Sequence, residues 1–239
     1  MKSVEVEIPV AGGTLRGTLE NAGDGSALVI FAHGRGSGRT SPRNRSVATA
    51  IRAAGISTLL FDLLTEEEEA IDCRTAQLRF DIGLLAQRLE AVTDWTVKRH
   101  ADDKGLAVGY FGTSTGAAAA LIAASRLGER VGAVVSRGGR PDLAGSFLEH
   151  VVSPTLLIAG QRDAEVITLN EQALSQLACD RDIAIVPRAG HLFDEPGALE
   201  EVARLATNWF HRHLAVAGAA TRSVQQCAAG GDCGRASGR

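Results

Sequence analysis

The stretch Gly112-Thr113-Ser114-Thr115-Gly116 holds a serine between two glycines in the pattern G-x-S-x-G. An apolar run over residues 106–111 precedes it and predicts a buried strand, and an alanine-rich run over residues 117–125 follows it and predicts a helix. A strand, a tight turn and a helix in this order hold a serine hydroxyl out at the carboxyl edge of a sheet, as in a nucleophile elbow. We therefore predict that Ser114 is a nucleophile; a connecting turn without chemistry is the alternative.

A serine needs a base to take its proton and a carboxylate to orient that base. Residues 154–160 predict a buried strand, and Asp163 lies in the loop after it. Residues 183–186 predict a later strand, and His191 lies in the loop after that one. The chain order serine, aspartate, histidine is typical of α/β-hydrolases. We predict a catalytic triad of Ser114, Asp163 and His191.

Acyl transfer also needs donors for the negative charge that develops on the substrate's carbonyl oxygen. The glycine-rich stretch His33-Gly34-Arg35-Gly36-Ser37-Gly38 follows the first fully apolar strand, over residues 27–32. We expect the backbone amides of Arg35 and Thr115 to form the oxyanion hole, and the His33 ring to bind the loop backbone. Phosphate binding is disfavoured, because the stretch lacks both the dinucleotide fingerprint and the lysine of a P-loop.

Arginines occur in three segments that should meet at the same sheet edge. They are Arg35, Arg39, Arg43, Arg45, Arg137 and Arg140. Paired hydrogen bonds from arginine recognise carboxylates, so Arg137 and Arg43 are candidate anchors for a negatively charged substrate. The alternative is that these arginines pair on the surface with Asp62, Asp142 or residues 66–69.

The predicted elements alternate between strand and helix after an N-terminal hairpin over residues 4–10 and 14–19. This pattern predicts a mainly parallel sheet of about eight strands with helices on both faces. Too few residues separate Val135 from Pro154 for a cap domain there. We therefore expect an open site that favours small, short-acyl esters.

Length and composition indicate one domain over residues 1–216 and a disordered Gly/Ala/Arg-rich tail over residues 217–239. A net charge of -3 with 45% hydrophobic residues disfavours nucleic-acid binding, and no run is long enough to cross a membrane, so we expect a cytoplasmic protein. The cysteines do not have zinc-site spacing, and residues 66–69 are expected to form a solvated acidic turn rather than a metal site. The oligomeric state stays open.

Seven segments carry a family resemblance: FAHGRGSG, SPRNR, FDLLTEEEE, GTSTG, VSRGGRPDL, GQRD and AGHLF. Together they resemble a bacterial group of small α/β-hydrolases placed with the dienelactone hydrolases, over residues 28–214. The resemblance implies the α/β-hydrolase fold and a serine hydrolase without a cofactor. The founding dienelactone hydrolases use a cysteine nucleophile, whereas position 114 is serine.

The function predicted from these residues is hydrolysis of small carboxylic esters or lactones through an acyl-enzyme on Ser114. An acyltransferase or perhydrolase would use the same acyl-enzyme and differ only in the nucleophile that attacks it. A catalytically silent binding module with this fold is a third possibility, although binding alone needs no base next to a serine.

Overall fold

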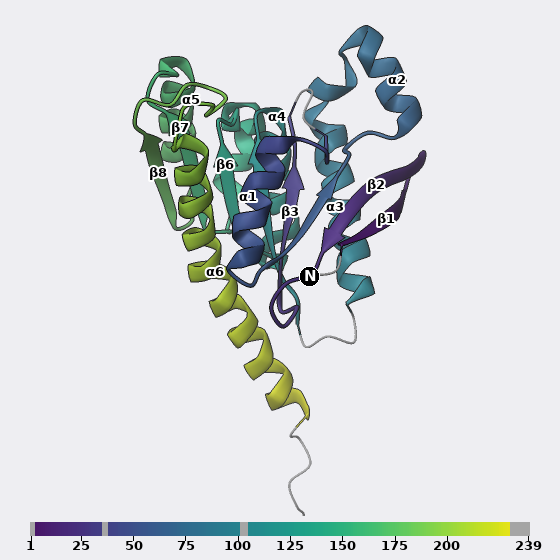
Figure 1. The fold of residues 1–239 in the computed structure, drawn as a ribbon. Helices are drawn as coiled ribbons and strands as arrows, with labels where there is room; N and C mark the ends of the chain where they lie inside the picture. Colours follow the sequence, from purple (N-terminus) through teal and green to yellow (C-terminus); the bar gives the residue numbers. More distant parts are fainter. Residues whose placement is uncertain (1–2, 35–37, 101–104, 230–239) are drawn as a thin grey trace, which may run out of the picture.

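The computed structural model describes residues 3–34, 38–100 and 105–229, with side chains described as far as Leu214. Within these ranges the chain forms one eight-stranded sheet of order β1-β2-β4-β3-β5-β6-β7-β8 (Figure 1). The strands are β1 (Ser3–Val10), β2 (Gly13–Glu20), β3 (Ala27–Ala32), β4 (Ser57–Phe61), β5 (Ala107–Thr113), β6 (Val131–Arg137), β7 (Thr155–Gly160) and β8 (Arg181–Val186). The first two strands pair antiparallel and β3 to β8 run parallel, as the alternation of elements predicts.

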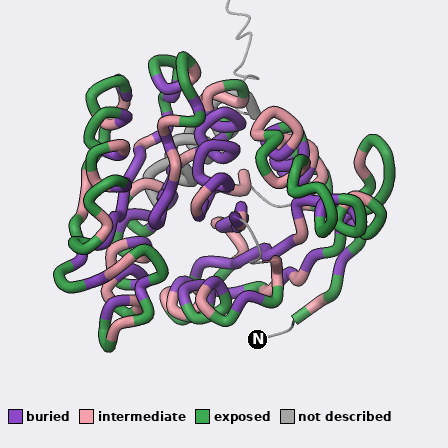
Figure 2. The backbone as a smooth tube through the Cα atoms, turned by 90° about the horizontal axis from the view of Figure 1, so that it is seen from above, coloured by how far each residue is buried: buried purple, intermediate pink, exposed green. Residues whose placement is uncertain are grey.

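Helices cover both faces of the sheet (Figure 1). One face carries α1 (Pro42–Ala53) and α6 (Ala198–Ala229), and the other carries α3 (Ile82–Arg99), α4 (Thr115–Leu127), the 3-10 segment η3 (Pro141–His150) and α5 (Ala164–Gln176). The central strands are buried on both sides, and the exposed residues lie on the outer faces of the helices, in the loops and at the sheet edges (Figure 2). Each face therefore has its own apolar core, and the carboxyl ends of the parallel strands are left to hold a site.

The connection from β4 to α3 differs from the prediction. The apolar pattern predicts one amphipathic helix over residues 78–99 after β4, whereas the structure has a helix, α2 (Glu66–Thr75), then a 3-10 turn, η1 (Leu78–Phe80), and then α3 from Ile82. The Thr65 hydroxyl accepts from the Glu68 amide, and the Glu68 carboxylate accepts from the Thr65 amide, which makes a capping box. Residues 66–69 are largely exposed, as expected of a solvated acidic turn, and they form the first turn of this helix, where their negative charges are stabilised by its positive dipole end.

The connection from β6 to β7 contains only η3, so no cap domain stands there. At the other end of the chain, α6 continues past Leu214 to Ala229, into the segment predicted to be disordered. Alanine is the best helix former, which explains a helix without core periodicity in this segment. Among the residues described, no helix is long and apolar enough to cross a membrane.

Candidate active site

Ser114 lies between β5 and α4 with φ 51° and ψ -125°, a conformation that side-chain-bearing residues rarely adopt. The flanking glycines explain how the chain can turn there. A Cβ at Gly112 would lie 2.5 Å from the Ala117 Cα, and one at Gly116 would lie 2.2 Å from the Ala32 carbonyl oxygen. Strand, turn and helix thus approach as closely as a nucleophile elbow requires, and Ser114 is held at the carboxyl edge of the sheet.

Asp163 and His191 are joined by a hydrogen bond of 2.6 Å between Asp163 Oδ2 and His191 Nδ1. The loops that carry them cross closely: the Arg162 amide donates to the Ala189 carbonyl at 2.9 Å, and a Cβ at Gly160 would meet the Gly190 carbonyl at 2.5 Å. The hydrogen bond between Asp163 and His191 fixes the orientation of the imidazole and leaves its other nitrogen, Nε2, without a bond to Asp163.

The loop after β6 lies against both Ser114 and His191. The Arg140 amide donates to the Ser114 carbonyl at 3.1 Å. A Cβ at Gly138 would lie 3.9 Å from His191 Cε1 and 3.2 Å from the His191 carbonyl oxygen. Within the described residues no hydrogen bond joins the Ser114 hydroxyl to the His191 ring, whose side chain is 47% exposed. The structure thus brings the three predicted triad residues, each on its own loop, to the same edge of the sheet. The imidazole is open to solvent.

Thr115 is the first residue of α4, where backbone N–H groups have no acceptor within the helix. Gly34 lies against the nucleophile, because a Cβ there would be 2.5 Å from Ser114 Cβ and 3.2 Å from Ser114 Oγ. Its amide donates to the Thr113 hydroxyl at 3.0 Å, which ties the end of β3 to the elbow. Arg35, the other predicted oxyanion residue, lies outside the described residues.

His33 binds backbone on both sides of its ring, as predicted. Nε2 accepts from the Leu63 amide at 3.1 Å, so Nδ1 carries the proton that bonds the Gly34 carbonyl, also at 3.1 Å. Burial lowers the pKa of His33, and the nearby carboxylates of Asp62 and Glu69 oppose this shift only partly. The neutral ring therefore joins the β3 loop to the β4 loop beside the elbow.

Arg137 is the one predicted anchor that the structure leaves without a carboxylate partner in the described part of the chain. It ends β6, is only 8% exposed, and has Nε and one terminal nitrogen buried without a hydrogen-bond partner. Its guanidinium lies 5.7 Å from the centre of the Phe193 ring. Burial and the neighbouring Arg43 lower the pKa of Arg137 to about 10, and Asp194 opposes this shift.

Arg43 is already paired. It forms two hydrogen bonds with Asp194, of 2.7 and 2.8 Å, so one carboxylate serves a cluster that also contains Arg137. Two further arginines pair as the surface alternative predicted, Arg39 with Asp62 and Arg140 with Asp142. Asp194 was not among the site residues predicted from the sequence, although its position three residues after His191 could have indicated it.

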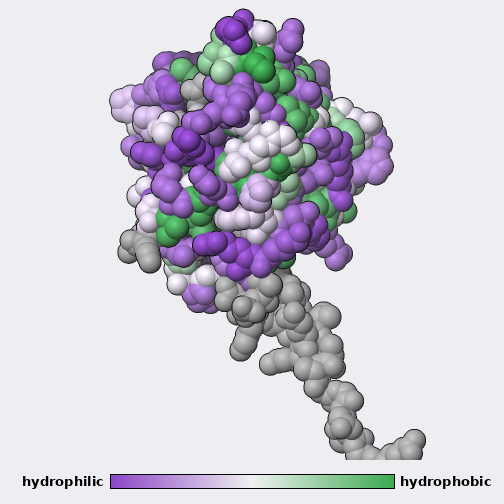
Figure 3. Space-filling model, turned by 90° about the vertical axis from the view of Figure 1, so that its right-hand side faces the viewer, coloured by the Kyte–Doolittle hydropathy of each residue, from purple (hydrophilic) through white to green (hydrophobic). Residues whose placement is uncertain are grey.

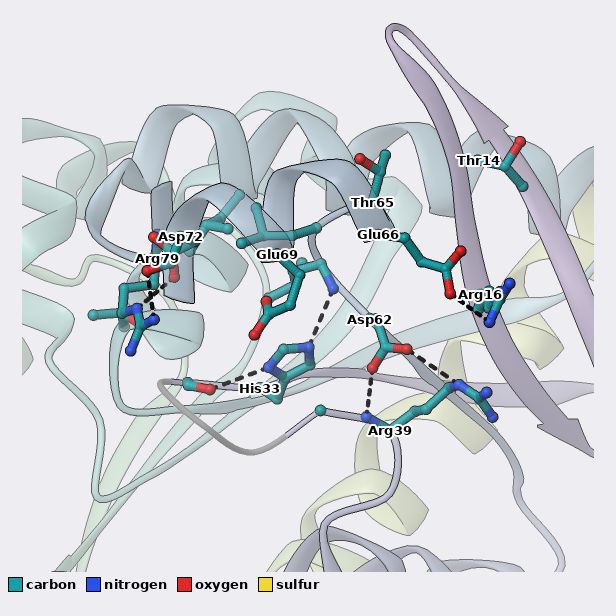
Figure 4. A pocket seen from close by; sticks show the side chains of 16 residues that line it. Thr14, Arg16, His33, Arg39, Asp62, Thr65, Glu66, Glu69, Asp72 and Arg79 are labelled. Carbon is teal, nitrogen blue, oxygen red and sulfur yellow. Dashed lines mark hydrogen bonds and ion pairs between the residues drawn. The ribbon is translucent and has the colours of Figure 1, made fainter. Parts of the chain in front are cut away.

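A cavity of about 370 Å³ adjoins the elbow on the side of α2. Gly34 and Thr115 form its boundary with the nucleophile, and α2 and the β4 loop form its outer wall (Figure 4). Most of its other lining side chains are charged: Arg16, Arg39, Asp62, Glu66, Glu69, Asp72 and Arg79. Sequence reasoning missed this cavity because it missed α2, for which the Thr65-to-Glu68 spacing was the available signal. No cluster of metal-binding side chains occurs among the described residues.

An α/β sheet of this topology, with a strained serine after its central strand and an Asp–His pair after two later strands, defines an α/β-hydrolase. No family model matches the chain. A solved structure, the dienelactone hydrolase from Anabaena variabilis, is 55% identical with a TM-score of 0.86, covering 89% of this chain and 98% of that protein. The chain therefore belongs to the dienelactone hydrolase family.

More distant structures share the fold. An esterase from Pyrococcus furiosus is 18% identical with a TM-score of 0.72, covering 89% of this chain and 93% of its own. Two curated relatives from Mycobacterium tuberculosis strains, provisionally named phosphoribosyl transferases, are 50% identical over 214 residues, which is 90% of this chain. The chain spans about half the length of these relatives, 47%.

Proposed function

We propose that the protein is a serine hydrolase that cleaves small carboxylic esters or lactones through an acyl-enzyme on Ser114. The observation that carries the proposal is the 2.6 Å hydrogen bond between His191 and Asp163, on loops that meet beside a serine in an elbow conformation. A fold that only bound ligands would have no need of a base oriented in this way. The phosphoribosyl transferase activity in the provisional name of the M. tuberculosis relatives is not assigned to this chain, because the chain spans only part of their length.

In the proposed reaction, Ser114 Oγ attacks the ester carbonyl carbon while His191 Nε2 takes the hydroxyl proton, and Asp163 stabilises the imidazolium. The Thr115 amide, with an amide of the preceding glycine-rich loop, holds the oxyanion. Collapse of the tetrahedral intermediate breaks the ester C–O bond, and the imidazolium gives its proton to the departing alcohol. Water then attacks the acyl-enzyme by the same route and releases the acid.

Replacement of the nucleophile tests this proposal. Ser114→Ala should lower kcat for a short-chain ester such as p-nitrophenyl acetate by a factor on the order of 10³ or more, since a triad acts as a unit. The melting temperature should stay close to the wild-type value, because the hydroxyl makes no core contact. Near wild-type turnover by folded Ser114→Ala would refute the assignment.

We further propose that Arg137 binds a negatively charged group of the substrate. A buried guanidinium with unpaired N–H groups is costly to hold, and a carboxylate would accept a charge-assisted hydrogen bond from it. Its neighbour Arg43 is neutralised by Asp194, so the cluster keeps one unmatched positive charge. Arg137 is the last residue of β6 and pairs in register with Thr113, which directly precedes the nucleophile.

Arg137→Met, which keeps length and removes charge, tests this role. For an ester that carries a carboxylate, kcat/KM should fall by about tenfold or more, and for its neutral analogue by less than about twofold. Stability should not fall, because the change removes an unpaired buried charge. Arg140→Gln is the matched control, since its side chain is paired with Asp142 on the same loop. Equal losses for both esters in Arg137→Met would exclude charge recognition.

A further inference from the structure

Among the residues that the structure describes, the charges that line the cavity beside α2 do not cancel. Each arginine of the lining is paired with one lining carboxylate: Arg16 with Glu66 at 2.7 Å, Arg39 with Asp62 at 3.1 Å, and Arg79 with Asp72. Arg39 also pairs with Glu5, outside the lining, at 2.7 Å. The remaining lining carboxylate is Glu69, which has no cationic partner among the described residues. Its one hydrogen bond is from the Cys73 thiol at 3.7 Å, a weak donor. The described lining thus carries one uncompensated negative charge.

Glu69 faces the inside of the cavity. Its carboxylate points from α2 toward the His33 ring (Figure 4), and its charge acts on that ring. His33 supplies no balancing charge, because burial keeps it neutral and both its nitrogens are bonded to backbone. The surrounding surface over β1, β2 and α2 is mostly hydrophilic (Figure 3), so polar ligands meet no apolar barrier there.

The cavity also adjoins the reaction centre, from which Gly34 and Thr115 separate it. Thr115, the residue after the nucleophile, lines it and is 4% exposed, and its hydroxyl has no hydrogen-bond partner. Gly34, the other boundary residue, lies against the Ser114 side chain. A group of the substrate attached to the reacting carbonyl can therefore extend into this space.

We propose that this cavity is the subsite for a positively charged, ammonium-bearing group of the substrate, held by Glu69. The inference rests on the proposed hydrolase function and narrows its substrate class. The unpaired carboxylate attracts a cation and repels an anion. Arg137 lies on the opposite side of Ser114, under the His191 loop, so the site is negative on the α2 side and positive on the other. Such a site favours a zwitterionic ester and fixes which way round it lies.

Binding and turnover are measured separately, each with pairs of compounds that have the same shape and differ in charge. Ligand-observed NMR compares choline with 3,3-dimethylbutanol, which has the same shape without the charge. Turnover compares acetylcholine with 3,3-dimethylbutyl acetate, and trimethylglycine methyl ester with methyl 3,3-dimethylbutanoate, so that the cation is placed on either side of the ester bond. The full chain is used as wild type, Glu69→Gln and Glu67→Gln. The last is the control, because Glu67 lies in the same helix turn but does not line the cavity.

Wild type should favour the charged ligand by about fivefold in Kd, and the charged ester by about fivefold in kcat/KM in one of the two series. Glu69→Gln should remove the preference and Glu67→Gln should keep it. Equal affinity of wild type for choline and its neutral analogue, or a preference that survives Glu69→Gln, would overturn the subsite. If choline binds through Glu69 but no ester is hydrolysed, the proposed hydrolase function fails and the cation site stands.

Discussion

The proposed chemistry depends on two features of single residues, the hydrogen bond between Asp163 and His191 and the buried guanidinium of Arg137, unpaired within the described residues. Ser114, Asp163 and His191 were found from local signals, since each follows a predicted strand and their order matches one fold. Their roles remain predictions, although the structure brings the residues together. Arg137 was one of several equivalent arginines in the sequence. In the part of the chain that the structure describes, Arg137 lacks a carboxylate partner because the fold places acidic residues beside Arg39, Arg43 and Arg140 instead. No local sequence pattern predicts these long-range pairings.

His33 predicts a pH dependence of stability. Its pKa is lowered in the folded state by burial, whereas the unfolded chain has the ordinary value of 6.5. The unfolded state therefore takes up a proton first as the pH falls. The stability that neutral His33 contributes is fully present above pH 6.5 and is lost as pH falls below it, by up to about 1.4 kcal/mol per pH unit.

Urea unfolding at pH 7.5, 6.5 and 5.5 measures this effect. His33→Gln should be less stable than wild type at pH 7.5 and should lose less stability on acidification. Burial also lowers the pKa of His213, which adds a slope of the same sign, so His33→Gln should keep part of the dependence. An unchanged slope in His33→Gln would show that His33 is not held neutral.

At the scale of elements, strands and helices with strong periodicity were predicted, and short connections were not. The N-terminal hairpin and the buried strands were recognised from alternation and from apolar runs, and the structure confirms them. In contrast, α2 has almost no apolar periodicity and buries only Asp72, so hydrophobic pattern gave no signal for it. The helix is specified by its capping box and acidic first turn instead, and it forms one wall of the cavity.

The close approach of β3 to α4 predicts a severe effect of one methyl group. Gly116→Ala would place a Cβ 2.2 Å from the Ala32 carbonyl oxygen, a backbone atom that cannot move without shifting the strand. The free energy of unfolding should fall by about 3 kcal/mol or more, and activity should fall with it. Gly83→Ala is the control, because its nearest neighbour is the Asp81 carboxylate at 3.4 Å. Denaturant unfolding of both variants checks this, and a change below about 1 kcal/mol in Gly116→Ala would contradict the elbow geometry.

At the scale of the whole molecule, the sheet order could be predicted only in outline. Alternating elements indicate a parallel sheet, but the placement of β3 between β4 and β5, which brings the glycine-rich loop beside Ser114, follows from long-range pairing. The same arrangement sets the cavity of α2 on one side of the nucleophile and the Arg137 cluster on the other. The extent of α6 was underestimated because a helix beyond the core needs no hydrophobic stripe.

Covalent labelling tests whether Ser114 is a nucleophile that His191 activates. The full chain is treated with a fluorophosphonate, whose phosphorus is attacked by an activated serine with loss of fluoride, and intact-mass spectrometry with peptide mapping locates the adduct. We expect one adduct per chain, on Ser114, absent from Ser114→Ala and formed on the order of 10³-fold more slowly in His191→Gln. No adduct on the wild-type protein, or one that forms equally fast in His191→Gln, would contradict the account.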